Sequence, residues 1–225
     1  MTYNEVMYMI LDELKLNSDD SYYTPEHILF LMNKYRTFLL KQRYADIKKQ
    51  VPFSNYQTIC LNLAPVPPIE GAYCEGKPYL RSINTIPNIM NIGSPRVFPQ
   101  DYFQGEITLI TMDRMRYTGF NKFMKNIIYA ARDPQGYLYL KADNPQFLYL
   151  EKVRFSAVFE DATVASEFEC PGENGSQCKL EDREFPIEGA LVPPLIELVV
   201  KELRGAEYMP EDTENNAKDD LSQAK

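Results

Sequence analysis

The chain has 225 residues, 44% hydrophobic and 25% charged, and its 32 acidic and 24 basic residues give a formal net charge of −8. This composition is typical of a globular protein with a real core, and its charge argues against nucleic acid as a first partner, since phosphates would be repelled. With no run of about eighteen apolar residues and no basic leader before the first apolar pattern, the sequence predicts a soluble protein without a membrane span or a cleaved signal.

A first amphipathic helix is expected from Thr2 to about Leu16. Thr2 and Glu5 have the spacing of a capping box, in which the two residues satisfy each other's backbone N–H groups. Apolar residues then recur on one face, namely Val6, Met7, Ile10 and Leu14. The polar stretch NSDDS ends the pattern.

A second helix is expected from Thr24 to about Lys49, which would make it about 37 Å long. Thr24 is a suitable N-cap, and Pro25 follows at a position where its missing N–H costs nothing. The expected buried stripe is Ile28, Leu31, Met32, Tyr35, Phe38 and Leu39. His27, the single histidine, falls in the first turn without an orienting partner, so we interpret it as an ordinary helix residue rather than a catalytic base.

The middle of the chain is expected to be β-structure. Closely spaced prolines exclude a helix over residues 64–99, and DPQG at 133–136 fits a type I turn. Near residue 155, apolar and polar residues alternate as in a half-buried antiparallel strand, with Val158 on the polar side. The inward set is Val153, Phe155, Ala157 and Phe159. With GEITLITM and NIIYAA as further strands, an antiparallel sheet or small sandwich of about five or six strands is expected.

A C-terminal helix is expected to begin at Pro194 and to end at Gly205. Its expected buried residues are Leu195, Ile196, Leu198, Val199 and Leu203. The acidic, almost wholly polar tail that follows cannot build a core, so we expect another chain to order it. The class is therefore α+β, with a helical segment (1–50), a mainly β domain (51–190), a C-terminal helix packing on the helical segment (191–205) and an acidic tail (206–225).

Sequence signatures of catalysis are missing. Neither phosphate-binding glycine motif nor G-x-S-x-G occurs, and one histidine cannot supply the usual His-pair sites. Carboxylate clusters at 159–162 and 180–185 are interpreted as solvated turns. The four cysteines are Cys60, Cys74, Cys170 and Cys178. They could form a zinc site or two disulfides, but their spacing favours free thiols in a reducing compartment. We expect no enzyme activity, no catalytic residue, no cofactor and no metal.

Residues 112–126 combine basic and aromatic side chains. The basic ones are Arg114, Arg116, Lys122 and Lys125, and the aromatic ones are Tyr117, Phe120 and Phe123. Such a stretch can form a nucleic-acid face. In an acidic protein we favour a cationic contact for an acidic neighbour, such as the tail of another copy.

Two parts of the sequence, about 1–50 and 137–220, resemble head-to-tail connector proteins (neck rings or adaptors) of tailed bacteriophages, and in particular the structural ring proteins of crAss-like podoviruses. The motifs concerned are LYLEKVRFSAVFEDA, which ends in the Phe-Glu-Asp of a strand end, and PEDTENNA, an acidic Asn-Asn tail after the last helix. The candidate interface consists of the four basic residues above and of four tail residues that the resemblance adds. The tail residues are Glu211, Asp212, Asn215 and Asn216.

The resemblance implies a non-enzymatic virion protein, synthesised in the host cytoplasm and assembled as a homo-oligomeric ring, often of twelve copies. Its implied partners are the portal protein and other neck or tail ring proteins, with DNA passing through the ring non-specifically and no membrane contact. One alternative is a carbohydrate-binding module or small enzyme with an aromatic β face formed by Tyr137, Tyr139, Phe147 and Tyr149. Another is a DNA-contacting module that uses residues 112–126.

Overall fold

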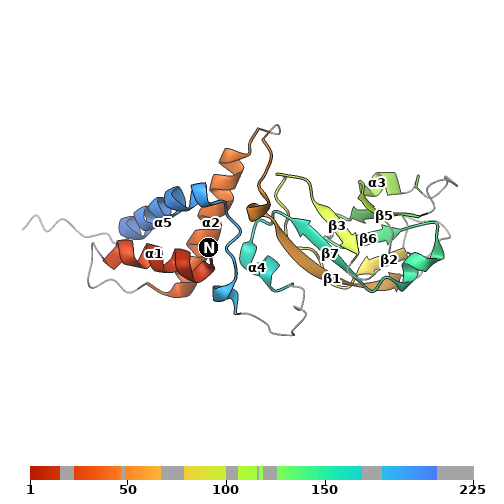
Figure 1. Cartoon of the computed structure of the whole chain (residues 1–225), viewed down its shortest axis with the longest axis horizontal. Coiled ribbons are helices and arrows are strands. Elements are labelled where there is room, and N and C mark those ends of the chain that lie inside the picture. The colour runs from red at the N-terminus through yellow and green to blue at the C-terminus, as the bar shows by residue number, and fades with distance from the viewer. Residues whose placement is uncertain are drawn as a thin grey trace, which may run out of the picture.

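The computed structural model describes residues 1–15, 23–46, 49–66, 79–99, 106–115, 117–118, 126–168 and 179–206. Within these residues, the three longest helices gather at one end of an elongated molecule and the strands at the other (Figure 1). The expected α+β class is confirmed. The tail at 207–225 lies outside the described residues.

The described elements are short, apart from three helices and one strand. The helices are α1 (Tyr3–Lys15), α2 (Pro25–Arg43), α3 (Met112–Met115), α4 (Ala162–Ser166) and α5 (Val192–Ala206). The 3-10 turns are η1 (Phe53–Asn55), η2 (Pro145–Tyr149), η3 (Leu180–Asp182) and η4 (Gly189–Leu191). The strands are β1 (Gln57–Val66), β2 (Tyr79–Ser82), β3 (Arg96–Pro99), β4 (Glu106–Leu109), β5 (Ile127–Arg132), β6 (Leu138–Lys141) and β7 (Lys152–Ala157).

The start of α1 follows the sequence prediction. The Thr2 N–H donates to the Glu5 carboxylate at 2.8 Å, and the Glu5 N–H donates to the Thr2 hydroxyl at 3.2 Å. Both contacts of the predicted capping box are therefore present.

The ends of α2 differ from the prediction. Thr24 is the N-cap residue, but its hydroxyl accepts no capping hydrogen bond. The helix ends at Arg43 rather than Lys49, so it is about 28 Å long. Tyr44 leaves the helical conformation, and its hydroxyl donates to the Glu188 carboxylate at 2.6 Å.

The buried face of α2 also differs from the expected stripe. Its buried residues are Ile28, Leu31, Met32, Arg36, Leu39 and Leu40. Phe38, which was expected in the stripe, is 54% exposed. It lies two positions from both Arg36 and Leu40, and two positions turn a helix by about 200°, so Phe38 is on the opposite face.

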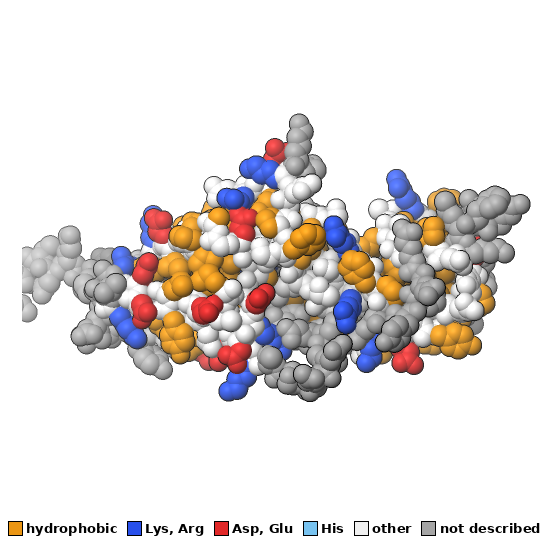
Figure 2. All heavy atoms as spheres, viewed as in Figure 1, with side chains coloured by type: hydrophobic (Ala, Val, Ile, Leu, Met, Phe, Trp, Pro, Cys, Tyr) orange, Lys and Arg blue, Asp and Glu red, His pale blue; other side chains and the backbone are white. Residues whose placement is uncertain are grey.

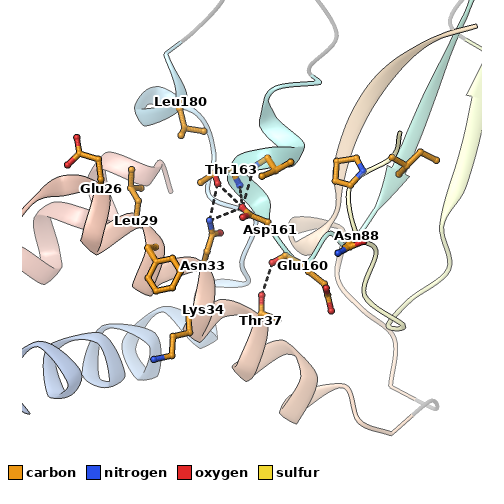
Figure 3. A pocket seen from close by; sticks show the side chains of 14 residues that line it. Glu26, Leu29, Asn33, Lys34, Thr37, Asn88, Glu160, Asp161, Thr163 and Leu180 are labelled. Atoms are coloured by element: carbon orange, nitrogen blue, oxygen red, sulfur yellow. Dashed lines mark hydrogen bonds between the residues drawn. The ribbon is translucent and has the colours of Figure 1, made fainter. Parts of the chain in front are cut away.

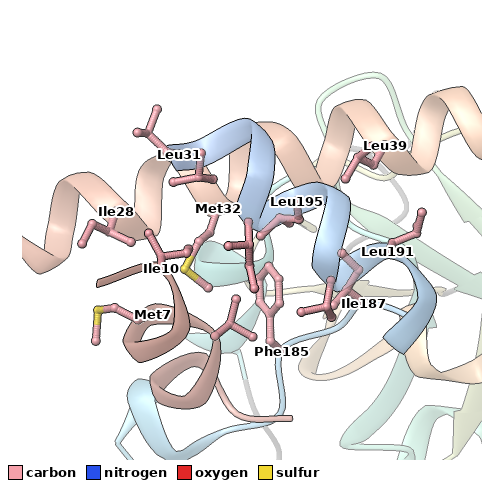
Figure 4. Packing of buried hydrophobic residues seen from close by; sticks show 14 of the residues in the cluster. Met7, Ile10, Ile28, Leu31, Met32, Leu39, Phe185, Ile187, Leu191 and Leu195 are labelled. Atoms are coloured by element: carbon pink, nitrogen blue, oxygen red, sulfur yellow. The ribbon is translucent and has the colours of Figure 1, made fainter. Parts of the chain in front are cut away.

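The helical end has its own core, in which α1, α2 and α5 pack on one another and on the segment between η3 and η4 (Figure 4). Ile10 from α1, Leu31 from α2 and Leu195 from α5 are all fully buried in it. Phe185 stacks edge-on against Tyr3 with ring centroids 4.9 Å apart. α5 begins at Val192, two residues before the predicted Pro194, because η4 leads directly into it.

Within the described residues, the seven strands form one sheet in the order β3-β7-β1-β2-β6-β5-β4. The edge strands β3 and β4 approach each other, so the sheet curls around a second core rather than forming a sandwich. The expectation of an antiparallel sheet is wrong at one edge, since β4 and β5 are parallel. The long connection between them, which includes α3, permits this, because parallel neighbours need a crossover. The predicted turn at 133–136 is present, with the Gly136 N–H donating to the Asp133 carbonyl at 3.1 Å.

The strand β7 shows how the two cores meet. Val153, Phe155 and Ala157 are buried inside the curled sheet, while Arg154 is exposed, as the alternation predicts. Val158, the exception to the pattern, is also buried, but in the helical core. Directly after β7, therefore, successive side chains enter different cores, with Phe159 completing the sheet core.

Candidate functional site

The helical end and the sheet are joined where α2 runs past residues 159–161, just after β7. Arg36 lies at the centre of this junction and is fully buried. Its guanidinium donates to the Phe159 carbonyl at 2.8 Å and to the Pro186 carbonyl at 2.7 Å, with a longer contact to Asn55 at 3.4 Å. One side chain thus links α2 to the end of β7 and to the strand-like segment before α5.

Burial sets the electrostatics of Arg36. It lowers the pKa of the guanidinium to about 10, although the nearby Tyr3 and Asp161 oppose that shift. The group therefore stays charged at neutral pH. The same burial raises the pKa of the Tyr3 hydroxyl to about 12, so Tyr3 is neutral there.

Three further residues of α2 hold the same segment on the same side of the helix. The Thr37 hydroxyl donates to the Glu160 carbonyl at 2.7 Å, and Lys41 forms an ion pair with the Glu160 carboxylate at 3.0 Å. Asn33 donates to the Asp161 carboxylate at 3.1 Å. These contacts fix the geometry of a groove that opens beside them.

The groove has a volume of about 920 Å³ and lies between α2, α4 and the loop before β3 (Figure 3). Its apolar lining is Leu29, Phe30, Ile86, Pro87, Val164 and Leu180, and its polar lining is Glu26, Asn33, Lys34, Thr37, Asn88, Glu160, Asp161 and Thr163. Phe30 is 64% exposed and Val164 39% exposed. Large apolar side chains therefore face solvent at this groove.

The polar groups of the groove have structural roles. Asp161 is the N-cap of α4, and its carboxylate accepts from the N–H groups of Thr163 and Val164 at 2.9 and 3.2 Å. Asp161 therefore stabilises the start of α4. No group of three or more His, Cys, Asp or Glu side chains in the described part of the chain is arranged to hold a metal ion. The groove thus combines apolar walls with polar groups that make hydrogen bonds within the fold.

Beside the groove, Lys34 connects α2 to α5. Its ammonium lies 2.7 Å from the Glu202 carboxylate, which also accepts a hydrogen bond from the Tyr35 hydroxyl. These two hydrogen bonds, with that from Lys34 the stronger influence, lower the pKa of Glu202 below its usual range. The bond to Glu202 in turn raises the pKa of Tyr35.

Most of the interface residues predicted from sequence cannot be placed. Arg114 is exposed on α3. The others lie outside the described residues, namely Arg116, Lys122, Lys125, Glu211, Asp212, Asn215 and Asn216. His27 is exposed in the first turn of α2. Arg114 is the one member of the set in the described part of the chain, so the pairing of these residues stays a prediction.

The alternative of an aromatic sugar-binding face loses its basis. Phe147, one of its four residues, is buried inside the curled sheet. Tyr139 packs against Tyr79, with ring centroids 5.7 Å apart, and Tyr137 lies against Arg81. Only Tyr149 of the four is fully open to solvent, at 84% exposure. Since the four rings do not form one exposed surface, they provide no stacking platform.

The expectation of free thiols is wrong for Cys60, which is disulfide-bonded. The other three cysteines lie outside the described residues. The Cys60 N–H donates to the Phe168 carbonyl at 2.7 Å, so β1 lies beside a segment more than a hundred positions later in the sequence. Spacing between cysteines could not reveal this proximity, because it arises from tertiary packing.

Sequence reasoning also missed the junction on α2. Asn33, Arg36 and Thr37 lie at positions i, i+3 and i+4, which place them on one helix face. The available signal was an arginine within the apolar period of the helix, between Met32 and Leu39. A charged residue at such a position indicates a buried hydrogen-bonding role.

The surface of the helical end carries exposed apolar side chains between charged ones (Figure 2). Tyr8 and Met9 on α1 are 59% and 43% exposed. Across the described residues, no helix combines the length and the hydropathy needed to cross a bilayer. Single exposed apolar residues are normal on a protein surface, whereas a large contiguous patch rimmed by polar residues marks an interaction site.

Comparison with known proteins agrees with this picture. Residues 5–221 match the family described as phage tail ring protein 2. The chain is 68% identical to Ring protein 2 of Bacteroides phage crAss001 over 225 residues, which cover the full length of both chains. Both findings support the resemblance inferred from the sequence and a structural, non-enzymatic role in the virion. The chain therefore belongs to the phage tail ring protein 2 family, whose members are structural components of the tail.

Proposed function

We propose that this ring protein assembles as a closed homo-oligomer in the neck, where it joins the portal to the rest of the tail and continues the channel through which DNA leaves the capsid. Twelve copies are the expected number. The observation that carries the proposal is the match to a ring protein over the whole chain. The neck position, the portal contact and the copy number go beyond that match.

Two physical features support the proposal. The first is the set of exposed apolar side chains around the groove, which a monomer would leave in water but a ring could cover. The second is the net charge of −8. A ring of acidic subunits repels the phosphate backbone, so DNA could pass without being retained.

Contacts between subunits are proposed to involve the cationic stretch at 112–126, which meets acidic groups of a neighbour. The acidic tail at 206–225 is proposed to lie against a neighbouring chain or the portal. Surface charges of this kind strengthen encounter and register, and their contribution weakens as salt rises.

Electron cryomicroscopy of purified particles tests the position and the copy number. With a small tag fused to this protein, we expect extra density as a ring between portal and tail, repeated around the axis. Density at the far tip of the tail or on the capsid would contradict the neck position. Deleting residues 207–225 tests the tail, since we expect unchanged monomer stability but fewer tagged copies per particle. Equal incorporation would refute the role proposed for the tail.

A further inference from the structure

The groove between α2 and α4 has apolar walls and an acidic rim. Three carboxylates line it, from Glu26, Glu160 and Asp161, against one ammonium, from Lys34. Lys34 is paired with Glu202 and Glu160 with Lys41, while Asp161 caps α4. Glu26 has no ion-pair partner among the described residues and is the carboxylate of the rim that remains open to a cation. A ligand that fits must therefore bring apolar surface and positive charge together.

One segment of this chain has that chemistry. Residues 114–125, RMRYTGFNKFMK, contain four basic and no acidic side chains, together with three aromatic rings. At its described end, Tyr117 is 81% exposed and Arg114 is also exposed. We propose that residues 114–125 of one copy dock in the α2–α4 groove of the adjacent copy, an inference that rests on the proposed ring.

The fold favours a neighbouring copy over the same copy as the source of the segment. The segment is anchored to its own sheet at both ends, since Met115 near its start is fully buried in its own copy and Ile128 just after it is buried in β5, so the residues beyond Met115 are those that would reach the neighbour. Figure 1 places α3 and β5 at the end of the molecule far from α2. Contact between two different surfaces of identical subunits is head-to-tail, and it builds a ring when the rotation from one subunit to the next closes after a full turn.

Other segments of the chain fit the groove less well. The tail at 207–225 carries six acids in the span from Glu207 to Asp220 against two lysines, so its net negative charge would be repelled by an acidic rim. Its apolar side chains, such as Tyr208, Met209 and Leu221, come without the positive charge that the rim requires. Residues 169–178, which precede Leu180 at the groove, contain two glutamates and no basic residue. Among these segments, the cationic stretch is therefore the one whose charge and apolar rings both match the groove.

Carbodiimide cross-linking locates the contact directly, since it joins a carboxylate to an amine only when the two touch. Full-length protein labelled with ¹⁵N is mixed with unlabelled protein at low concentration, and the mixture is concentrated until rings form. We expect cross-linked peptides that join Glu26 or Glu160 to Lys122 or Lys125, with one partner ¹⁵N and the other ¹⁴N. The inference is overturned if the two lysines link to tail carboxylates, if their links to the groove occur only within one copy, or if rings form without such links.

Charge reversal gives an independent measurement. Glu26→Lys and Lys122→Glu should each raise the dissociation constant between subunits at least tenfold, equivalent to about 1.4 kcal/mol, and the double variant should recover most of the loss. Glu197→Lys, on the exposed side of α5, is the matched control and should change the constant less than threefold. Failure of the double variant to recover would overturn the pairing.

An apolar variant tests the groove walls. Phe30→Ser should weaken association at least tenfold without changing the melting temperature of the monomer. Tyr149→Ser, at an even more exposed aromatic residue away from the groove, should leave association unchanged. Rings that form equally well in Phe30→Ser overturn this inference and leave the proposed function intact. A chain that stays monomeric in solution and is missing from virions overturns the proposed function itself, and this inference with it.

Discussion

Replacing Arg36 tests whether the junction between the helical end and the sheet depends on one buried side chain. In Arg36→Met, which keeps much of the volume, the carbonyls of Phe159 and Pro186 lose donors at 2.8 and 2.7 Å. A buried carbonyl left without a donor costs about 1–3 kcal/mol, so the two cost about 2–6 kcal/mol. The contact at 3.4 Å adds little.

Part of this loss is offset, because the variant no longer has the desolvation penalty of a buried charge. Burial opposes that charge, as the lowered pKa of Arg36 shows, and no carboxylate pairs with it directly in the described structure. We expect a net loss of about 3 kcal/mol, which in a domain of this size lowers the melting temperature by about 6–12 °C. The stability of Arg36→Lys should fall between that of wild type and that of Arg36→Met, since an ammonium cannot reproduce the planar fork of donors.

The assay is urea unfolding followed by circular dichroism. The matched control is Arg154→Met, at an exposed position of β7, whose free energy of unfolding should lie within about 0.5 kcal/mol of wild type. The effect should be the same at pH 6 and pH 8. Both the folded pKa of about 10 and the higher ordinary value of an arginine lie above this range, so Arg36 is protonated in both states and contributes no pH dependence. If Arg36→Met unfolds at the same urea concentration as Arg154→Met, the reasoning about the junction is wrong.

Three further predictions use the same unfolding assay. Phe155→Ala should lose about 3–5 kcal/mol because the ring is fully buried, while Phe53→Ala, at an exposed ring, should lose much less; similar losses would place Phe155 outside the core. Glu202→Gln should differ from wild type by less than about 1 kcal/mol at pH 7. Folding lowers the pKa of Glu202, so the stabilisation that its charged carboxylate provides is present above the ordinary pKa of 4.5 and is lost as pH falls through the folded pKa. A difference between Glu202→Gln and wild type that persists at pH 2 would refute the assignment. His27→Gln should change neither stability nor ring formation, and impaired assembly would show that His27 lies in a contact.

The predictions that held depend on residues close together in sequence. The capping box of α1 requires only Thr2 and Glu5, three positions apart. The turn at 133–136 and the alternation along β7 are local in the same way. Short-range patterns of this kind are fixed by backbone geometry, whatever the rest of the chain does. The resemblance to phage ring proteins likewise came from contiguous motifs, and the match over residues 5–221 confirmed it.

The features that only the tertiary structure decided involve partners far apart in sequence. Arg36 is stabilised in the core by carbonyls 123 and 150 positions away, so its burial could not be derived from its helical neighbours. Phe38 was assigned to the wrong face because apolar character alone does not distinguish a buried ring from one left open for a partner. The curling of the sheet, the parallel β4–β5 pair and the disulfide at Cys60 each depend on which segments meet. The groove depends on the same condition, because its walls come from α2, the loop before β3 and α4, which the packing of the helical end against the sheet brings together.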